Sequence, residues 1–134
     1  MPGKSQRGAL IPAALALVAL SAPAAHAQQY TYTVLYSLAG PPADGANPVG
    51  LIRDSEGNFY GVAGQGGAHN LGALFKLAAD GAESVLYSFP GYPNDGTSPT
   101  LGLVRDAEGN LYGTTFLGGA FNYGTVFKLD TAGV

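Results

Sequence analysis

Cysteine and tryptophan are absent from this chain of 134 residues, and histidine and charged residues are scarce. Without cysteine the protein can form neither a disulfide framework nor a thiolate metal site, so its fold must rely on packing. The two histidines are His26 and His69. A lone histidine in a glycine-rich stretch, such as His69, is more often solvated than catalytic or metal-bound. We therefore expect no cofactor and no histidine-based catalysis.

Long apolar runs are missing after residue 27, but one lies before it. Lys4 and Arg7 precede the stretch ALIPAALALVAL (9–20), and SAPAAHA (21–27) follows it. This order is typical of a secretory signal peptide, which predicts cleavage after residue 27 and export to the periplasm, the extracellular space or the cell surface. The alternative is an uncleaved anchor, although the stretch falls short of the roughly 20 residues of a membrane span. The predicted mature chain contains no further candidate span.

Positive charge is also rare in the predicted mature chain. Of the six basic residues, Lys4 and Arg7 lie before the cleavage point, so four remain against nine acidic residues, a net charge of 4 − 9 = −5. Nucleic-acid binding needs a basic surface, and an anionic membrane face attracts basic residues. The charge balance therefore argues against both partners.

Glycine and aromatic residues are plentiful instead. The chain has 21 glycines, eight tyrosines and six phenylalanines, and all the aromatic residues follow residue 27. Disordered glycine-rich linkers lack such aromatics, whereas short β-strands joined by tight turns combine both. No amphipathic helical period occurs in this part of the chain. The composition therefore predicts an all-β fold.

The second half of the chain repeats the first. The phrase RDSEGNFYG (53–61) returns as RDAEGNLYG (105–113), and 18 of the 33 aligned pairs from 50/102 to 82/134 are identical. TVLYSL (33–38) likewise matches SVLYSF (84–89). Such identity indicates an internal duplication. We assign repeat 1 to residues 28–82 and repeat 2 to residues 83–134.

Each repeat has the composition of four short strands separated by glycine, proline, asparagine and aspartate. The expected strands are 33–38, 50–54, 58–63 and 72–77 in repeat 1 and 84–89, 102–106, 110–115 and 124–129 in repeat 2. Four antiparallel strands in about 50 residues match the size of a propeller blade. The sequence thus predicts two four-stranded antiparallel blade-like repeats of a β-propeller-like architecture.

These repeats resemble the tandem repeat of the GloVer class, found in exported proteins described as choice-of-anchor tandem repeat proteins. The resemblance covers residues 33–134 and is carried by LYSF (86–89) and DGTSPTLGLVRDAEGNLYGTTFLGGAFNYGTVFKL (95–129). Repeat 1 departs from the pattern at Val62-Ala63 and Ala73-Leu74. The resemblance implies a propeller-like β-fold outside the cytoplasm and brings no catalytic residues with it.

Two blades do not close a propeller of about 4–8 blades. Three explanations remain open: a fragment of a longer gene product, a short protein that assembles several copies into a ring, or a monomeric stack of two sheets. Open sheet edges favour pairing with other chains, so we list self-association among the expected interactions.

Repeated acidic residues are the first site candidates. Asp54 and Glu56 recur as Asp106 and Glu108 beside a predicted hairpin turn. We interpret them as hairpin residues in equivalent surroundings, with the aspartates accepting hydrogen bonds from the turn's own amides. The alternatives are a weak Ca²⁺ site and a carboxylate pair for glycoside hydrolysis.

Loop aromatics are the second candidates. Phe121 and Tyr123 follow Gly118-Gly119, and exposed rings suit protein or sugar partners, although most aromatics here should pack between blades. The sequence therefore predicts a non-catalytic exported tandem-repeat protein, a structural or binding module that presents loops to a protein or glycan partner. The alternative is a fragment of a propeller-type enzyme acting on extracellular polysaccharide.

Overall fold

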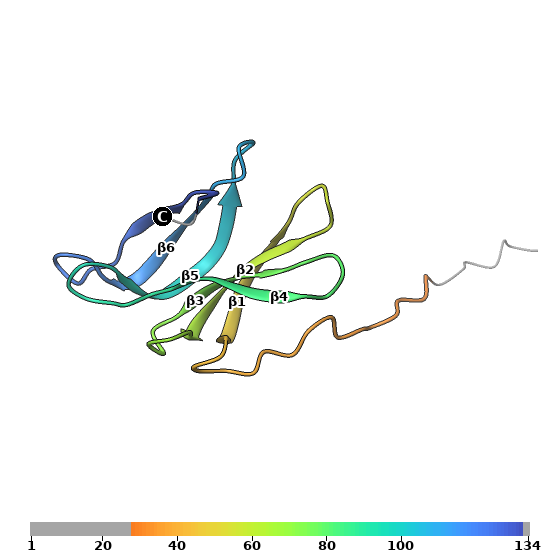
Figure 1. Cartoon of the computed structure of the whole chain (residues 1–134), viewed down its shortest axis with the longest axis horizontal. Coiled ribbons are helices and arrows are strands. Elements are labelled where there is room, and N and C mark those ends of the chain that lie inside the picture. The colour runs from red at the N-terminus through yellow and green to blue at the C-terminus, as the bar shows by residue number, and fades with distance from the viewer. Residues whose placement is uncertain (1–27, 133–134) are drawn as a thin grey trace, which may run out of the picture. The chain divides into compact units, whose positions relative to one another are not determined.

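Residues 28–132 are described by a computed structural model, and they form an all-β fold without a helix (Figure 1). Its strands are β1 (Gly45–Arg53), β2 (Phe59–Gly66), β3 (Ala73–Leu77), β4 (Glu83–Ser88), β5 (Gly96–Arg105), β6 (Leu111–Gly118) and β7 (Val126–Leu129). The prediction of an all-β chain is confirmed. The predicted signal peptide, residues 1–27, lies outside the described residues, as do residues 133–134.

The first sheet has the order β1-β2-β3-β4 and the second, within the described residues, has the order β5-β6-β7. All neighbouring strands are antiparallel. Each strand therefore follows its neighbour through a short turn, as the glycine-rich and aspartate-rich connections predicted. The two sheets formed by residues 28–132 do not show a closed propeller.

The prediction of four strands in each repeat is wrong in its assignment of the first strand. Residues 33–38 form no strand, and their counterpart in repeat 2 is β4, which pairs with β3 of the first sheet. The turn at Asp80-Gly81 explains this, because the N–H of Ala78 donates to the carbonyl of Ala82 at 2.7 Å. A turn this tight returns the chain alongside β3.

Sheet and sequence repeat are consequently out of phase by one strand. The sequence places the start of repeat 2 at residue 83, yet β4 (Glu83–Ser88) completes the first sheet and the second sheet begins at Gly96. The described part of repeat 2 therefore contributes three strands to its own sheet. The two repeats are similar in sequence, but their corresponding strands pair with different partners in the structure.

An extra residue distinguishes the two repeats, and it lies at a break in strand pairing. Pro48 matches Pro99 at an offset of 51, while Gly50 matches Gly102 at an offset of 52. The β5–β6 register shifts between Thr100 and Val104. A bulge absorbs one additional residue without disturbing the pairing on either side. The insertion is therefore accommodated locally.

The hydrophobic core lies between the two sheets. Its buried members are Val62 and Leu74 from the first sheet, Leu103, Leu111 and Leu129 from the second, and Phe89 from the connection between them. Alternate residues of a strand point to the same face, which is how each sheet gathers these side chains on one side. Fully burying each such side chain contributes about 1.5–3 kcal/mol.

Candidate functional site

Asp54, the repeated aspartate of the β1–β2 hairpin, accepts its hydrogen bonds from groups of the same hairpin. Oδ1 of Asp54 accepts hydrogen bonds from the backbone N–H groups of Glu56 (3.0 Å) and Asn58 (2.9 Å). Oδ2 accepts from Nδ2 of Asn58 (3.0 Å) and from the hydroxyl of Tyr60 (3.2 Å). The carboxylate therefore bridges the turn to the following strand.

Asp106 occupies the same surroundings in the β5–β6 hairpin. It accepts from the backbone N–H of Asn110 (2.8 Å), from Nδ2 of Asn110 (2.7 Å) and from the hydroxyl of Tyr112 (2.9 Å). The hydrogen bond from the asparagine amide is the main reason that the pKa values of Asp54 and Asp106 are lowered to about 2. The predicted equivalence of the two corners is confirmed.

These contacts assign the repeated acids a structural role. A general acid needs a raised pKa, whereas Asp54 and Asp106 stay ionised and hydrogen-bonded. Glu56 and Glu108 lie exposed beside them. Among residues 28–132, no group of three or more histidine, aspartate or glutamate side chains is placed to hold a metal ion.

A second aspartate recurs in both repeats, as Asp44 and Asp95 at an offset of 51, and the structure gives it a role in the fold. Asp44 is 2% exposed. Its carboxylate accepts from the backbone N–H groups of Ala39 and Gly40, both at 3.0 Å, and from the hydroxyl of Tyr36 at 3.1 Å. This hydrogen bond is the main cause of the raised pKa of Tyr36. The aspartate anchors the segment before β1.

The equivalent pair in repeat 2 is Tyr87 and Asp95, which are hydrogen-bonded through the tyrosine hydroxyl. That bond raises the pKa of Tyr87 to about 12. Both repeats therefore contain two tyrosine–aspartate pairs at matching positions. The signal that could have revealed them is the recurrence of Tyr36 and Asp44 at an offset of 51.

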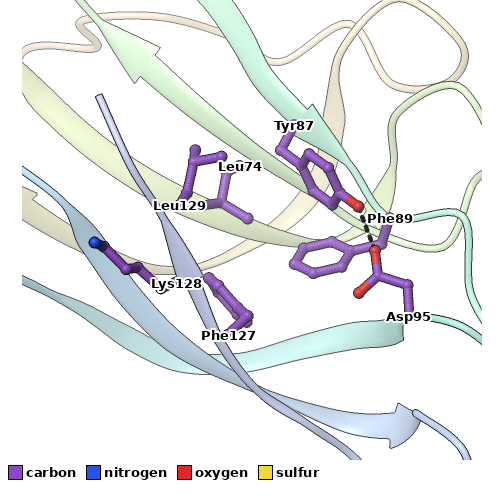
Figure 2. Close-up of a pocket in the computed structure, with 7 residues that line it drawn as sticks. All are labelled: Leu74, Tyr87, Phe89, Asp95, Phe127, Lys128 and Leu129. Carbon is purple, nitrogen blue, oxygen red and sulfur yellow. Dashed lines mark hydrogen bonds between the residues drawn. The ribbon is translucent and has the colours of Figure 1, made fainter. Parts of the chain in front are cut away.

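A cavity of about 120 Å³ lies beside this second pair, between the sheets (Figure 2). Phe89 makes edge-to-face contacts there with Tyr87 and Phe127, each at a centroid distance of 5.3 Å. Leu74 and Leu129 are further lining residues. The carboxylate of Asp95 already accepts from Tyr87, as Figure 2 shows. The lining is mostly apolar, which fits a packing gap in the core better than a reactive site.

Tyr60 joins the two sheets at a larger hollow of about 230 Å³. Nζ of Lys76 lies 5.7 Å and Cζ of Arg105 lies 5.5 Å from the centre of its ring. Contacts of a cation with an aromatic face contribute about 0.5–1 kcal/mol at exposed sites. Lys76 and Tyr60 both belong to the first sheet, whereas Arg105 ends β5 of the second, so the contact of Arg105 with Tyr60 is the one that links the two sheets.

The predicted binding residues Phe121 and Tyr123 are both highly exposed, at 84% and 92%. They flank Asn122, which holds the loop between β6 and β7. Oδ1 of Asn122 accepts from the N–H of Gly118 at 2.9 Å, and the backbone N–H of Asn122 donates to the carbonyl of Gly119 at 3.1 Å. The two rings therefore project from a loop whose backbone is fixed by hydrogen bonds.

The matching loop of repeat 1 separates the roles of these two positions. Phe121 corresponds to His69, which is exposed, so that position faces solvent in both repeats. Tyr123 corresponds to Leu71, which is partly buried because repeat 2 covers it. The carbonyl of Leu71 accepts from the N–H of Ser98 at 2.8 Å. Only Phe121 therefore occupies a position that stays open when a following repeat is present.

The described residues include no helix long and apolar enough to cross a membrane. No curated protein and no solved structure matches the chain. A family model does match it, the Gloeobacter/Verrucomicrobia repeat, over residues 24–134. This match confirms the GloVer resemblance seen in the sequence. Because it spans most of the molecule, including both repeats described above, the chain belongs to the Gloeobacter/Verrucomicrobia repeat family.

Proposed function

We propose that this chain is a non-catalytic exported repeat module whose loops bind a protein or glycan partner. Its membership of a repeat family supports this reading. Export is inferred from the order of Lys4, Arg7, the apolar stretch 9–20 and the Ala-His-Ala ending at residue 27. Asp54 and Asp106, whose pKa values are lowered to about 2, serve the hairpins, so these acids are poor candidates for catalysis.

The observation that carries the proposal is the exposed ring of Phe121 on a fixed loop. The ring of Phe121 is 84% exposed, so a partner that covers it removes apolar surface from water. The hydrogen bonds of Asn122 keep the loop from folding the ring back. A rigid aromatic offers much contact area at a small cost in conformational entropy. Sugar faces and apolar protein patches are the surfaces that such a ring fits.

Binding to a glycan array and to immobilised cell-surface proteins tests the proposal. We expect wild-type binding that weakens at least about tenfold in Phe121→Ala. His69→Ala is the matched control, because it changes the same loop position in repeat 1. Equal binding by wild type and Phe121→Ala would contradict the assignment of this residue.

A parallel hydrolysis panel with extracellular polysaccharides tests the alternative of a propeller-type enzyme. We expect no turnover. Turnover that disappears in Glu108→Gln, with folding unchanged by circular dichroism, would overturn the non-catalytic reading and favour the enzyme. Glu108 suits this purpose because it is exposed, so its replacement should leave the hairpin intact.

A further inference from the structure

The outer edge of β7 differs from its equivalent in repeat 1. β3 pairs with β2 on one side and with β4 on the other. Within residues 28–132, β7 pairs with β6 alone. The two strands correspond residue by residue, with Phe75-Lys76-Leu77 matching Phe127-Lys128-Leu129. The second sheet therefore presents an edge at which the first sheet holds a fourth strand.

A segment with the sequence of that missing strand exists in the same chain. Residues 33–38 (TVLYSL) match SVLYSF (84–89), most of which is β4. Residues 33–38 form no strand, and Val34 and Leu35 are 58% and 62% exposed. β-Branched and aromatic residues of this kind favour strands when an edge is available.

The end of this segment is already held as it is in β4. The hydroxyl of Tyr36 donates to Asp44, as that of Tyr87 donates to Asp95. Tyr87 makes this bond while it lies opposite Leu74 in the β3–β4 pair. The tyrosine–aspartate bond is thus compatible with strand pairing, and it reduces the conformational freedom that pairing would remove.

One face of the second sheet is also uncovered. Val126 lies opposite Thr114 and Val104 lies opposite Tyr112, and Phe116 follows two residues after Thr114. Alternation places all of them on one side of the sheet. Val104, Phe116 and Val126 are 68%, 67% and 84% exposed. We call this side, defined by Val104, Phe116 and Val126, the open face.

The same side of the first sheet is buried by the second sheet. Leu74, the equivalent of Val126, is 1% exposed, and Val62, the equivalent of Thr114, is also 1% exposed. Ile52, the equivalent of Val104, packs against the same core. The contact between the two sheets of this chain therefore shows what covers such a face. The cover is the sheet of a following repeat.

We propose that a second copy of this chain docks on the second sheet, head to tail. Residues 33–38 of the second copy add a fourth strand beside β7, and its first sheet covers the open face. The segment cannot serve its own second sheet in the manner of β4, because β4 pairs with the sheet that precedes its repeat. Within residues 28–132 no sheet precedes residues 33–38, and the preceding sheet that we propose for them is the second sheet of another copy. This inference does not depend on the proposed function.

The β3–β4 register specifies how the two copies pair. Lys76 lies opposite Ser84 in the first sheet, so Lys128 should lie opposite Thr33 of the second copy. The N–H of Ser98 donates to Leu71, and Asn47 of the second copy should donate to Tyr123 in the same way. Ser98 and Asn47 share a left-handed backbone, with φ values of 52° and 56°. This contact accounts for the exposure of Tyr123 within a single copy.

Sedimentation velocity over a concentration series tests the association with the whole chain. We expect wild type to form dimers or larger head-to-tail species as its concentration rises. Val126→Lys should raise the dissociation constant at least about tenfold, because it buries an unpaired charge in the new contact. Val34→Pro combined with Leu35→Pro should act similarly. Successive N–H groups point to opposite edges of a strand, so one proline removes a donor facing β7.

All these positions are exposed in a single copy, so the variants should melt like dilute wild type. Phe121→Ala is the matched control and should associate normally, while Val126→Lys should retain ligand binding per copy. This separates failure of the docking from failure of the proposed function. A wild-type chain that stays monomeric, or variants that associate as well as wild type, would overturn the proposal.

The register has its own test, made simple by the absence of native cysteine. Chains carrying Thr33→Cys and chains carrying Lys128→Cys are mixed and oxidised. Residues directly opposite in antiparallel strands have Cα atoms about 4.5–5.5 Å apart, which a disulfide can span. We expect a covalent dimer from the mixture and little from either chain alone. Dimers formed equally well by Thr33→Cys alone would point to a different, symmetric pairing and would refute the head-to-tail register.

Discussion

Leu74 and Val126 occupy the same position in the two repeats, and replacing each by alanine measures what the inter-sheet contact contributes. Leu74 is 1% exposed in the core, while Val126 is 84% exposed on the open face. Leu74→Ala removes three carbon groups, which is about 2.4 kcal/mol at about 0.8 kcal/mol each. The site already borders the 120 Å³ cavity, and the additional void adds to the cost. We expect a total loss of about 3–4 kcal/mol.

Val126→Ala should change the free energy of unfolding by no more than about 0.5 kcal/mol at concentrations where copies are dissociated. Urea unfolding followed by circular dichroism measures both variants, because the chain has no tryptophan for fluorescence. A loss below about 1 kcal/mol for Leu74→Ala, or equal losses for the two variants, would show that the sheets do not pack through this face. Since a domain of this size has about 5–15 kcal/mol of stability, Leu74→Ala should remain measurable.

Two further predictions concern the repeated turns. Gly118 has a φ of 90°, so Gly118→Ala should destabilise the fold by at least about 1 kcal/mol. Gly102→Ala is the control, because no atom lies within 4 Å of the added carbon, and it should change stability by no more than about 0.5 kcal/mol. Equal urea midpoints for the two variants would contradict this prediction. Asp54 and Asp106 have folded pKa values of about 2, below the usual 3.8. A depressed folded pKa stabilises the fold above the unfolded pKa and loses that stabilisation as the pH falls towards 2. Melting temperatures should therefore fall between about pH 4 and pH 2, and less steeply in Asp54→Asn combined with Asp106→Asn; an unchanged slope would exclude these carboxylates as the cause.

The hairpin corners could be predicted from the sequence because their bonds are local. Asp106 reaches Asn110 and Tyr112 within six residues, so any fold that forms the turn forms these contacts. The exposure of Phe121 was predictable for a similar reason, since it lies at the tip of a glycine-rich loop. The tyrosine–aspartate pairs at Asp44 and Asp95 could also have been predicted, because Tyr36 and Asp44 recur as Tyr87 and Asp95 at an offset of 51.

The role of Tyr123 and the sheet to which β4 belongs could not be read in the same way. Tyr123 and Leu71 hold equivalent positions, and what differs is whether a following repeat is present to cover them. Residues 33–38 and β4 have nearly the same sequence, yet β4 pairs with the edge of β3, whereas residues 33–38 pair with no strand among the described residues. A strand is defined by its partner, which a short segment does not specify.

The sequence by itself determined the duplication, the all-β character and the hydrogen-bonded corners, because each depends on residues close together in the chain. Tertiary structure alone decided which copy of each repeated face is buried. Leu74 and Val126 follow the same strand pattern, and one is covered while the other is open to solvent. Burial is a property of two surfaces in contact, so similar local sequences differ in burial, and in what they contribute to stability, according to what packs against them.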